Sequence, residues 1–141
     1  MSVNLMVEDL SQVISQATAP AFLLGAVAAF VSVLIGRLNR IADRSVALAA
    51  IAGEDQSSAA FHNLAGLRRR ARLINKAIEY AVASGIFTTI LVIVAFATAA
   101  LGLNHAYGAA LLFVLALGFF ASSLIFLWRE VRISVHALEL I

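Results

Sequence analysis

Two short blocks of basic residues stand out in an otherwise apolar chain. They are "GRLNRIADRS", Gly36 to Ser45, and "LRRRARLINK", Leu67 to Lys76, and together they hold eight of the ten lysines and arginines of the sequence. Clustered guanidinium groups bind phosphates and carboxylates, and when repeated around an axis they focus an electric field on passing ions. The chemistry of these blocks could therefore recognise an anion or form the mouth of a pore.

Helical periodicity groups these charges into faces. Each residue of an α-helix turns about 100°, so Arg37, Arg40 and Arg44 fall within about 60° of one another, and Arg68, Arg72 and Lys76 share a face in the same way. If the two segments fold back on each other, three charged levels form: Arg37 with Glu79, Arg40 with Lys76, and Asp43 with Arg72 or Lys76. The candidate charge network is Arg37, Arg40, Asp43, Arg44, Arg72, Lys76 and Glu79.

The charges have two interpretations. As topology determinants, lipid-headgroup contacts and salt bridges, they need nothing beyond the excess of basic residues that cytoplasmic loops carry. As a ring at a cytoplasmic pore mouth, they would act on ions. Nucleic-acid binding by "RRRAR" is disfavoured because no stacking aromatic residues are interleaved with it.

The elements that position these residues follow from composition. Apolar residues make up 62% of the 141 residues, mean hydropathy is +0.98 and there is no cysteine, which is typical of a membrane protein. We expect an all-α integral membrane protein, since a span needs about 20 apolar helical residues. The predicted segments are an amphipathic N-terminal helix over 1–18, spans over 19–36, 80–103 and 109–128, a hairpin over 37–79, a short outer turn over 104–108 and a C-terminal helix over 129–141.

The ends of the first span carry local signals. Thr18 is a plausible N-cap and Pro20 would lie in the first turn, where a missing N–H costs nothing. Ahead of it, apolar residues from Val3 to Ala17 recur at helical spacing, which indicates a helix lying on the membrane or against a neighbour. Glu8 and Asp9 take the place of the basic start of a signal peptide, so we expect the first span to be retained.

Orientation follows from the basic residues. They lie between the first two spans or just after the third, at Arg129 and Arg132, and none precedes the first span or lies in 104–108. The positive-inside rule therefore predicts the N-terminus outside and both the hairpin and the C-terminus in the cytoplasm; the bacterial inner membrane is what the family resemblance described below implies.

Two near-heptad stripes indicate that the first two spans continue into an antiparallel hairpin. The first stripe is Leu34, Leu38, Ile41, Ser45, Leu48 and Ala52, and the second is Leu64, Leu67, Ala71, Ile74, Ile78, Ala81 and Gly85. The turn-rich stretch Gly53 to Ser58 separates them. After the third span, Val131, Val135 and Leu138 form one face, and we expect this tail to pack along the hairpin.

Small residues form a further stripe in the first span, at Gly25, Ala29, Ser32 and Gly36. Such residues let helices approach closely in lipid, either within one chain or between copies. Because three helices can hardly enclose a path, any conduction would have to run between subunits, and we expect a homo-oligomer.

Catalysis and active transport are disfavoured. The second and third spans hold no ionisable residue, only hydroxyl groups, whereas proton-coupled transporters usually carry an intramembrane carboxylate or histidine. His62, His105 and His136 are too scattered to hold one metal, and no paired acid motif appears. We therefore expect no enzymatic activity, no metal and no cofactor.

The chain resembles a family of short bacterial membrane proteins classified as a domain of unknown function. The resemblance rests on Ala19 to Ser45, where Pro20 opens the first span and "GRLNRIADR" follows it, and continues in "LRRRARLINKAI", Leu67 to Ile78. It implies a small membrane protein with about three helices and implies no activity.

Two classes of function remain open. The first is a small passive ion channel or pore formed by a homo-oligomer, with charges at its cytoplasmic mouth and ions as further partners. The alternative is a non-conducting scaffold or regulatory subunit whose hairpin docks a protein or lipid partner. In either case the expected partners include membrane lipids and other copies of the chain, and exclude nucleic acid.

Overall fold

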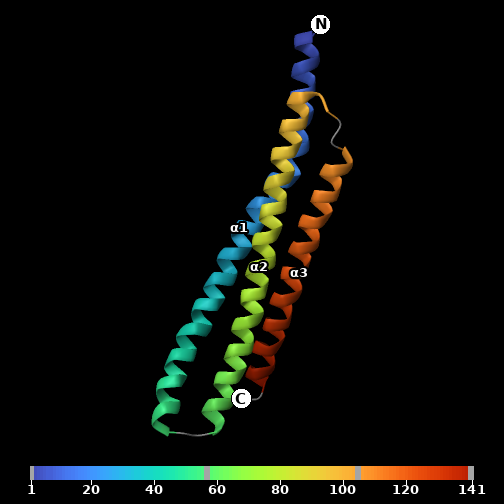
Figure 1. Cartoon of the computed structure of the whole chain (residues 1–141). Coiled ribbons are helices and arrows are strands. Elements are labelled where there is room, and N and C mark those ends of the chain that lie inside the picture. Colours follow the sequence, from blue (N-terminus) through green and yellow to red (C-terminus); the bar gives the residue numbers. More distant parts are fainter. Residues whose placement is uncertain (1, 56–57, 104–105, 140–141) are drawn as a thin grey trace. The chain divides into compact units, whose positions relative to one another are not determined.

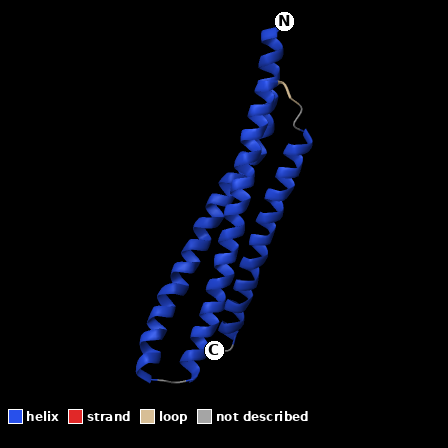
Figure 2. Cartoon of the chain, in the orientation of Figure 1, coloured by secondary structure: helices blue, strands red, loops and turns tan. Residues whose placement is uncertain are grey.

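The protein folds into three long α-helices. The computed structural model describes residues 2–55, 58–103 and 106–139, and in order along the chain these form α1 (Ser2–Asp55), α2 (Ser58–Leu101) and α3 (Ala106–Glu139) (Figure 1). Every regular element in these ranges is an α-helix (Figure 2), which confirms the all-α prediction.

All three helices are longer than a membrane requires. At 1.5 Å per residue the 54 residues of α1 extend about 80 Å, and the 44 of α2 and 34 of α3 extend about 66 Å and 51 Å. A hydrocarbon core is about 30 Å thick. Each helix contains a stretch long and apolar enough to cross a membrane, so the polar remainder of each must lie outside any hydrocarbon layer that it crosses.

One continuous helix, α1, stands where the sequence suggested a new helix beginning at Thr18. The Thr18 hydroxyl does not cap an N-terminus but donates a hydrogen bond to the carbonyl of Ile14, 3.3 Å away in the preceding turn. Pro20 lies inside the helix and is buried. A proline in the interior removes one backbone donor, and apolar helices tolerate this loss where neighbouring groups compensate.

Gly102 ends α2. It has a φ of 68°, and its N–H donates to the carbonyl of Ala99 at 3.2 Å, while the N–H of Leu103 donates to Thr98 at 2.9 Å. This is a Schellman motif, in which a residue with positive φ satisfies the last carbonyls of a helix. Glycine suits that position because it has no Cβ to clash with the following carbonyl.

Buried residues recur every seven positions on α1 and α3, and at alternating spacings of three and four along most of α2. On α1 they are Pro20, Val27, Leu34 and Ile41; on α2 they are Leu67, Ile74, Ala77, Ala81, Ser84, Thr88 and Leu91; on α3 they are Ala116, Ser123 and Glu130. Such heptad spacing keeps one seam of each helix against its neighbours. It confirms the centres of both predicted stripes, and the members flanking them are half-buried, namely Leu38, Ser45, Leu48, Leu64, Ala71, Ile78 and Gly85.

Interhelical polar contacts between α2 and α3 follow the same repeat. Ser84 contacts Ala116, Ala77 contacts Ser123, and Arg70 contacts Glu130. Each pair lies seven residues earlier on α2 and seven later on α3 than the pair before it. Within unit 2, where two of these pairs lie, α2 and α3 are therefore antiparallel neighbours.

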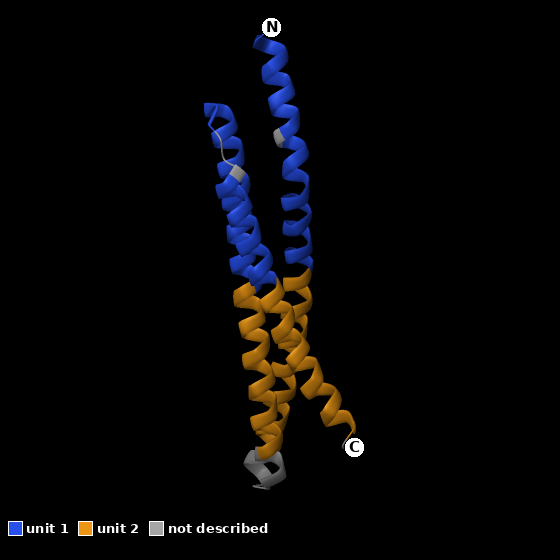
Figure 3. Cartoon of the chain, turned by 90° about the vertical axis from the view of Figure 1, so that its right-hand side faces the viewer, with its two compact units in different colours: residues 1–29, 81–120 blue, residues 30–80, 121–141 orange. Residues whose placement is uncertain are grey.

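The chain divides into two compact units (Figure 3). Unit 1 comprises residues 1–29 and 81–120, and within it the rings of Phe87 and Phe119 stack with centroids 5.2 Å apart. Unit 2 comprises residues 30–80 and 121–141, and within it Tyr80 stacks on Phe126, also at 5.2 Å. In both units aromatic stacking joins α2 to α3.

The predicted apolar face at the end of α3 does not pack as expected. Val135 is 49% exposed and Leu138 is 67% exposed, and only Val131 is half-buried. The buried face of α3 instead contains Ser123 and Glu130. A seven-residue repeat set by Ala116 thus determines which side of the tail is covered, so this part of the prediction is wrong.

Candidate functional site

The carboxylate of Glu130 joins all three helices of unit 2. Its side chain is completely buried. Oε2 accepts hydrogen bonds from Nε and Nη2 of Arg37 on α1, at 2.9 and 2.5 Å, and Oε1 accepts one from Nε of Arg70 on α2, at 2.9 Å. One side chain of α3 is thereby tied to both other helices, and we call these three residues the Glu130 cluster.

The Glu130 cluster carries more positive than negative charge. Two guanidinium groups share a single carboxylate, so the cluster keeps one positive charge. The Arg37 side chain is 31% exposed and that of Arg70 is 17% exposed, against none for Glu130. A buried charge is tolerated only when it is paired and hydrogen-bonded, and removing one partner leaves the others uncompensated.

An arginine-lined pocket opens beside this cluster. It has a volume of about 220 Å³, and its lining residues are Arg37, Arg40, Ile41 and Arg44 from α1, Leu67 and Arg70 from α2, and Ser134 from α3. Arg40 and Arg44 are exposed, and neither makes an ion pair with any described residue. The pocket therefore combines two fixed guanidinium groups with two that no carboxylate in the described chain neutralises.

The predicted charge network is only partly assembled. The structure brings together Arg37, Arg40 and Arg44, as the shared helical face predicted. Arg37 pairs with Glu130 in place of the expected Glu79. The other predicted members, Asp43, Arg72, Lys76 and Glu79, are exposed, and no ion pair within the described residues involves them.

Sequence reasoning missed Glu130 and Arg70 as site residues. Both carry a signal in the heptad repeat: Glu130 lies seven residues after buried Ser123, and Arg70 lies between Leu67 and Ile74 at spacings of three and four. Arg37 has the same relation to Leu34 and Ile41. Charged residues at interior heptad positions of neighbouring helices are natural partners, and this test would have found the cluster.

Hydroxyl groups in the apolar stretches serve the backbone. Ser84 donates to the Ala116 carbonyl at 2.7 Å and Ser123 to that of Ala77 at 2.5 Å, and both serines are fully buried. Buried Thr88 donates to Ser84, while Thr89 and Thr98 also bond carbonyls of their own helix. These five hydroxyls are engaged with protein, as is common in membrane helices.

The small-residue stripe lies on the outside of the chain. Gly25, Ala29, Ser32 and Gly36 are all exposed, and a Cβ added at Gly25 or Gly36 would meet nothing within 4 Å. Gly85 differs, because its added Cβ would lie 3.6 Å from Val27. Close approach within the chain thus occurs at Gly85 and not at the predicted stripe.

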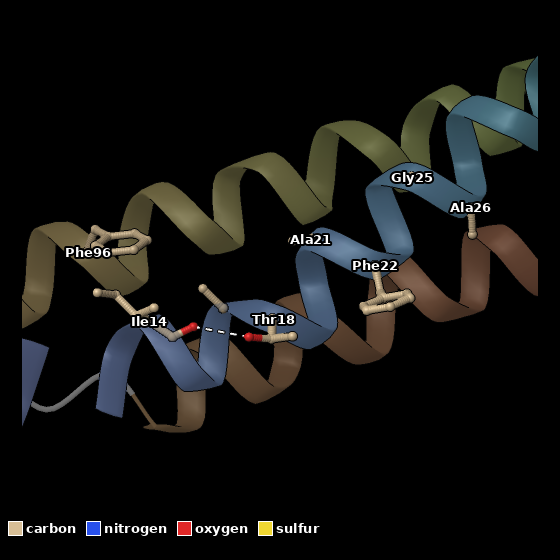
Figure 4. Close-up of a pocket in the computed structure, with 8 residues that line it drawn as sticks. Ile14, Thr18, Ala21, Phe22, Gly25, Ala26 and Phe96 are labelled. Carbon is tan, nitrogen blue, oxygen red and sulfur yellow. Dashed lines mark hydrogen bonds between the residues drawn. The ribbon is translucent and has the colours of Figure 1, made fainter. Parts of the chain in front are cut away.

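An apolar groove lies in unit 1. Its volume is about 750 Å³, and it runs along α1 with Phe96 of α2 as its other wall (Figure 4). Seven of its residues belong to α1: Ile14, Ala17, Thr18, Ala21, Phe22, Gly25 and Ala26. The one hydroxyl there, on Thr18, is bonded to Ile14, so the groove offers apolar contact and no charge.

Histidines and acids do not gather in the described chain. Within residues 2–55, 58–103 and 106–139, no three histidine or acidic side chains lie close enough to hold a metal ion. His62 and His136 are exposed. Asn104 and His105 of the predicted outer turn lie outside the described residues, as do residues 56 and 57 of the predicted hairpin turn, whereas residues 106–108 belong to α3.

Three long apolar helices with a buried ionic contact at one end of their apolar stretches define an all-helical membrane protein with transmembrane helices. Within that class the chain belongs to the family described as Protein of unknown function (DUF2721), whose model matches residues 17–140. The match includes every residue of the Glu130 cluster and of the arginine-lined pocket. No curated protein and no solved structure matches the chain.

Proposed function

We propose that the protein is a non-conducting membrane scaffold or regulatory subunit whose arginine-rich segments dock an anionic partner. The proposal rests on one observation: the buried polar side chains are hydrogen-bonded within the protein. The hydroxyls of Ser84, Thr88 and Ser123 are buried and bonded to carbonyls, and Arg37 is bonded to Glu130. Groups that hold helices together are not available to line a hydrated path.

The proposed topology has the N-terminus outside the bacterial inner membrane and α1 and α2 extended into a cytoplasmic hairpin. The distribution of basic residues supports it, since all ten lie in 37–76 or after residue 128. The chain has no native cysteine, so an Ala65→Cys variant reports on one site. We expect an impermeant maleimide to label it only after cells are permeabilised; labelling in intact cells would contradict the orientation.

Self-association through the exposed small-residue stripe belongs to the same proposal. In lipid, helices associate by close backbone approach, and Gly25 and Gly36 have open space where a partner helix could lie. A path between copies remains the alternative, a passive ion channel. The geometry favours the scaffold because the hydroxyl-bearing faces that such a path would need are bonded within the chain.

Reconstitution in liposomes tests both points. We expect no ion flux above that of protein-free vesicles across several salts, voltages and calcium concentrations. In the same vesicles, a mixture of donor-labelled and acceptor-labelled protein should show energy transfer. We expect the double variant Gly25→Leu/Gly36→Leu to abolish this transfer. The control Gly108→Leu, at another exposed glycine, should leave it unchanged. Single-channel current would overturn the scaffold, and energy transfer unaffected by the leucines would remove the stripe from the interface.

A further inference from the structure

We propose that the arginine-lined pocket binds the phosphate of an anionic phospholipid headgroup. The inference deepens the proposed function, on whose topology it rests, by assigning a ligand to the docking segments. Four guanidinium groups, of Arg37, Arg40, Arg44 and Arg70, line the pocket, and the carboxylate of Glu130 neutralises one of them. The pocket therefore keeps an excess of three positive charges, and none of the side chains that line it is acidic.

The two inner arginines are held in place before any ligand arrives. Glu130 takes Nε and Nη2 of Arg37 but only Nε of Arg70. Both Nη groups of Arg70 therefore have no hydrogen-bond partner among the described residues, although 83% of that side chain is covered. A phosphate oxygen in the pocket accepts from such a guanidinium fork in a charge-assisted hydrogen bond.

The outer arginines complete the cradle. Arg40 and Arg44 are one turn apart on α1, are exposed, and have no carboxylate partner in the described chain. Ser134 of α3 adds a hydroxyl to the lining. At about 220 Å³ the space is smaller than the roughly 300 to 1,000 Å³ of pockets that enclose drug-sized ligands, so it suits a headgroup phosphate better than a nucleotide.

The surroundings favour a lipid over a free phosphate. Directly before Arg37, Val33 is 56% exposed and Ile35 is 45% exposed, which offers apolar surface to acyl chains. On α3, the exposed ring of Trp128 precedes Glu130 by two residues, and the Arg132 guanidinium lies 5.0 Å from its centroid. Tryptophan and arginine at the end of an apolar helical stretch are typical of the headgroup region. Because Trp128 and Arg132 flank Glu130, we place the pocket at the depth of lipid phosphates.

Lipid retention during purification tests the proposal. The protein is reconstituted in nanodiscs of phosphatidylcholine with a minor share of phosphatidylglycerol, extracted into detergent, and weighed by native mass spectrometry. We expect wild-type protein to retain phosphatidylglycerol selectively and Arg40→Gln/Arg44→Gln to retain at least about tenfold less, because each basic residue near the surface contributes roughly a fivefold factor. The matched control is Arg68→Gln/Arg69→Gln, which removes equal charge at exposed positions outside the pocket.

Three outcomes separate the sources of the phosphate and the proposed function. Equal loss of retention in both double variants would mean general surface attraction and would overturn the pocket. Binding of inorganic phosphate to protein in pure phosphatidylcholine, without retention of phosphatidylglycerol, would overturn the lipid source. Retention of phosphatidylglycerol together with ion flux in liposomes would support the pocket while overturning the scaffold, so the two proposals fail independently. Circular dichroism of each variant confirms that it is folded.

Discussion

Units 1 and 2 use the same heptad positions of α2 and α3 for different chemistry. In unit 1, Ser84 of α2 donates to a carbonyl of α3. In unit 2 the direction reverses and Ser123 of α3 donates to a carbonyl of α2. Seven residues earlier on α2 and seven later on α3, the pair becomes Arg70 and Glu130, and α1 joins it through Arg37. Neutral hydroxyls thus give way to charges at equivalent positions.

The difference reflects the cost of charge in an apolar environment. The stretches around Ser84 and Ala116 are uninterrupted apolar helix, where an ionised side chain costs several kcal/mol, while a hydroxyl can bond a carbonyl that is already in the helix ladder. Unit 2 contains the basic blocks and holds the charge of Glu130 because two guanidinium groups pair with it. We therefore expect the loss of one charged partner in unit 2 to lower stability more than the loss of one hydroxyl in unit 1.

The largest expected effect follows from Glu130→Gln. The amide keeps the size but leaves Arg37 and Arg70 without a counter-ion, so we expect a loss of roughly 3 kcal/mol in the free energy of unfolding, the lower part of the range for breaking buried pairs. Unfolding in mixed detergent micelles measures it. Glu139→Gln, at an exposed carboxylate of the same helix, is the control and should change nothing measurable. Equal stability of the two variants would remove the cluster from the account.

A small and equal effect is expected from Ser84→Ala and Ser123→Ala. Each deletes one interhelical hydroxyl bond, which in membrane proteins contributes about 0.6 kcal/mol on average. The same unfolding assay compares them, with Thr89→Val as a control because Thr89 is exposed and bonds only its own helix. A loss at Ser123 several times that at Ser84 would mean that the two positions are not equivalent and that the comparison between the units is wrong.

Sequence predicted the elements well and the ionic site poorly. Three helices and the centres of both stripes, such as Leu34 and Ile74, were readable because an apolar period of seven needs no knowledge of neighbours. The partner of Arg37 was not, because the predicted hairpin considered α1 and α2 alone and so chose Glu79. The buried acid lies on α3, and only the register between helices reveals it.

The same reasoning explains the other differences. Thr18 has the chemistry of an N-cap, but a hydroxyl can equally bond the preceding turn, and the neighbouring apolar residues continue the helix. Val135 and Leu138 form a plausible apolar face, yet the repeat through Ser123 and Glu130 covers the other side. In both places the structure follows the pattern of the whole helix and not the pattern of a few neighbouring residues.

Glu130 and Arg70 stabilise unit 2 through a shared ionic contact. A double-mutant cycle tests this coupling most directly. The free energies of unfolding of Glu130→Gln, Arg70→Gln and the double variant are measured in the same micelles as wild type. We predict that the double variant is more stable than the sum of the single losses implies, with a coupling of about 1 kcal/mol or more. Additive losses, within about 0.5 kcal/mol, would contradict a shared ionic contact.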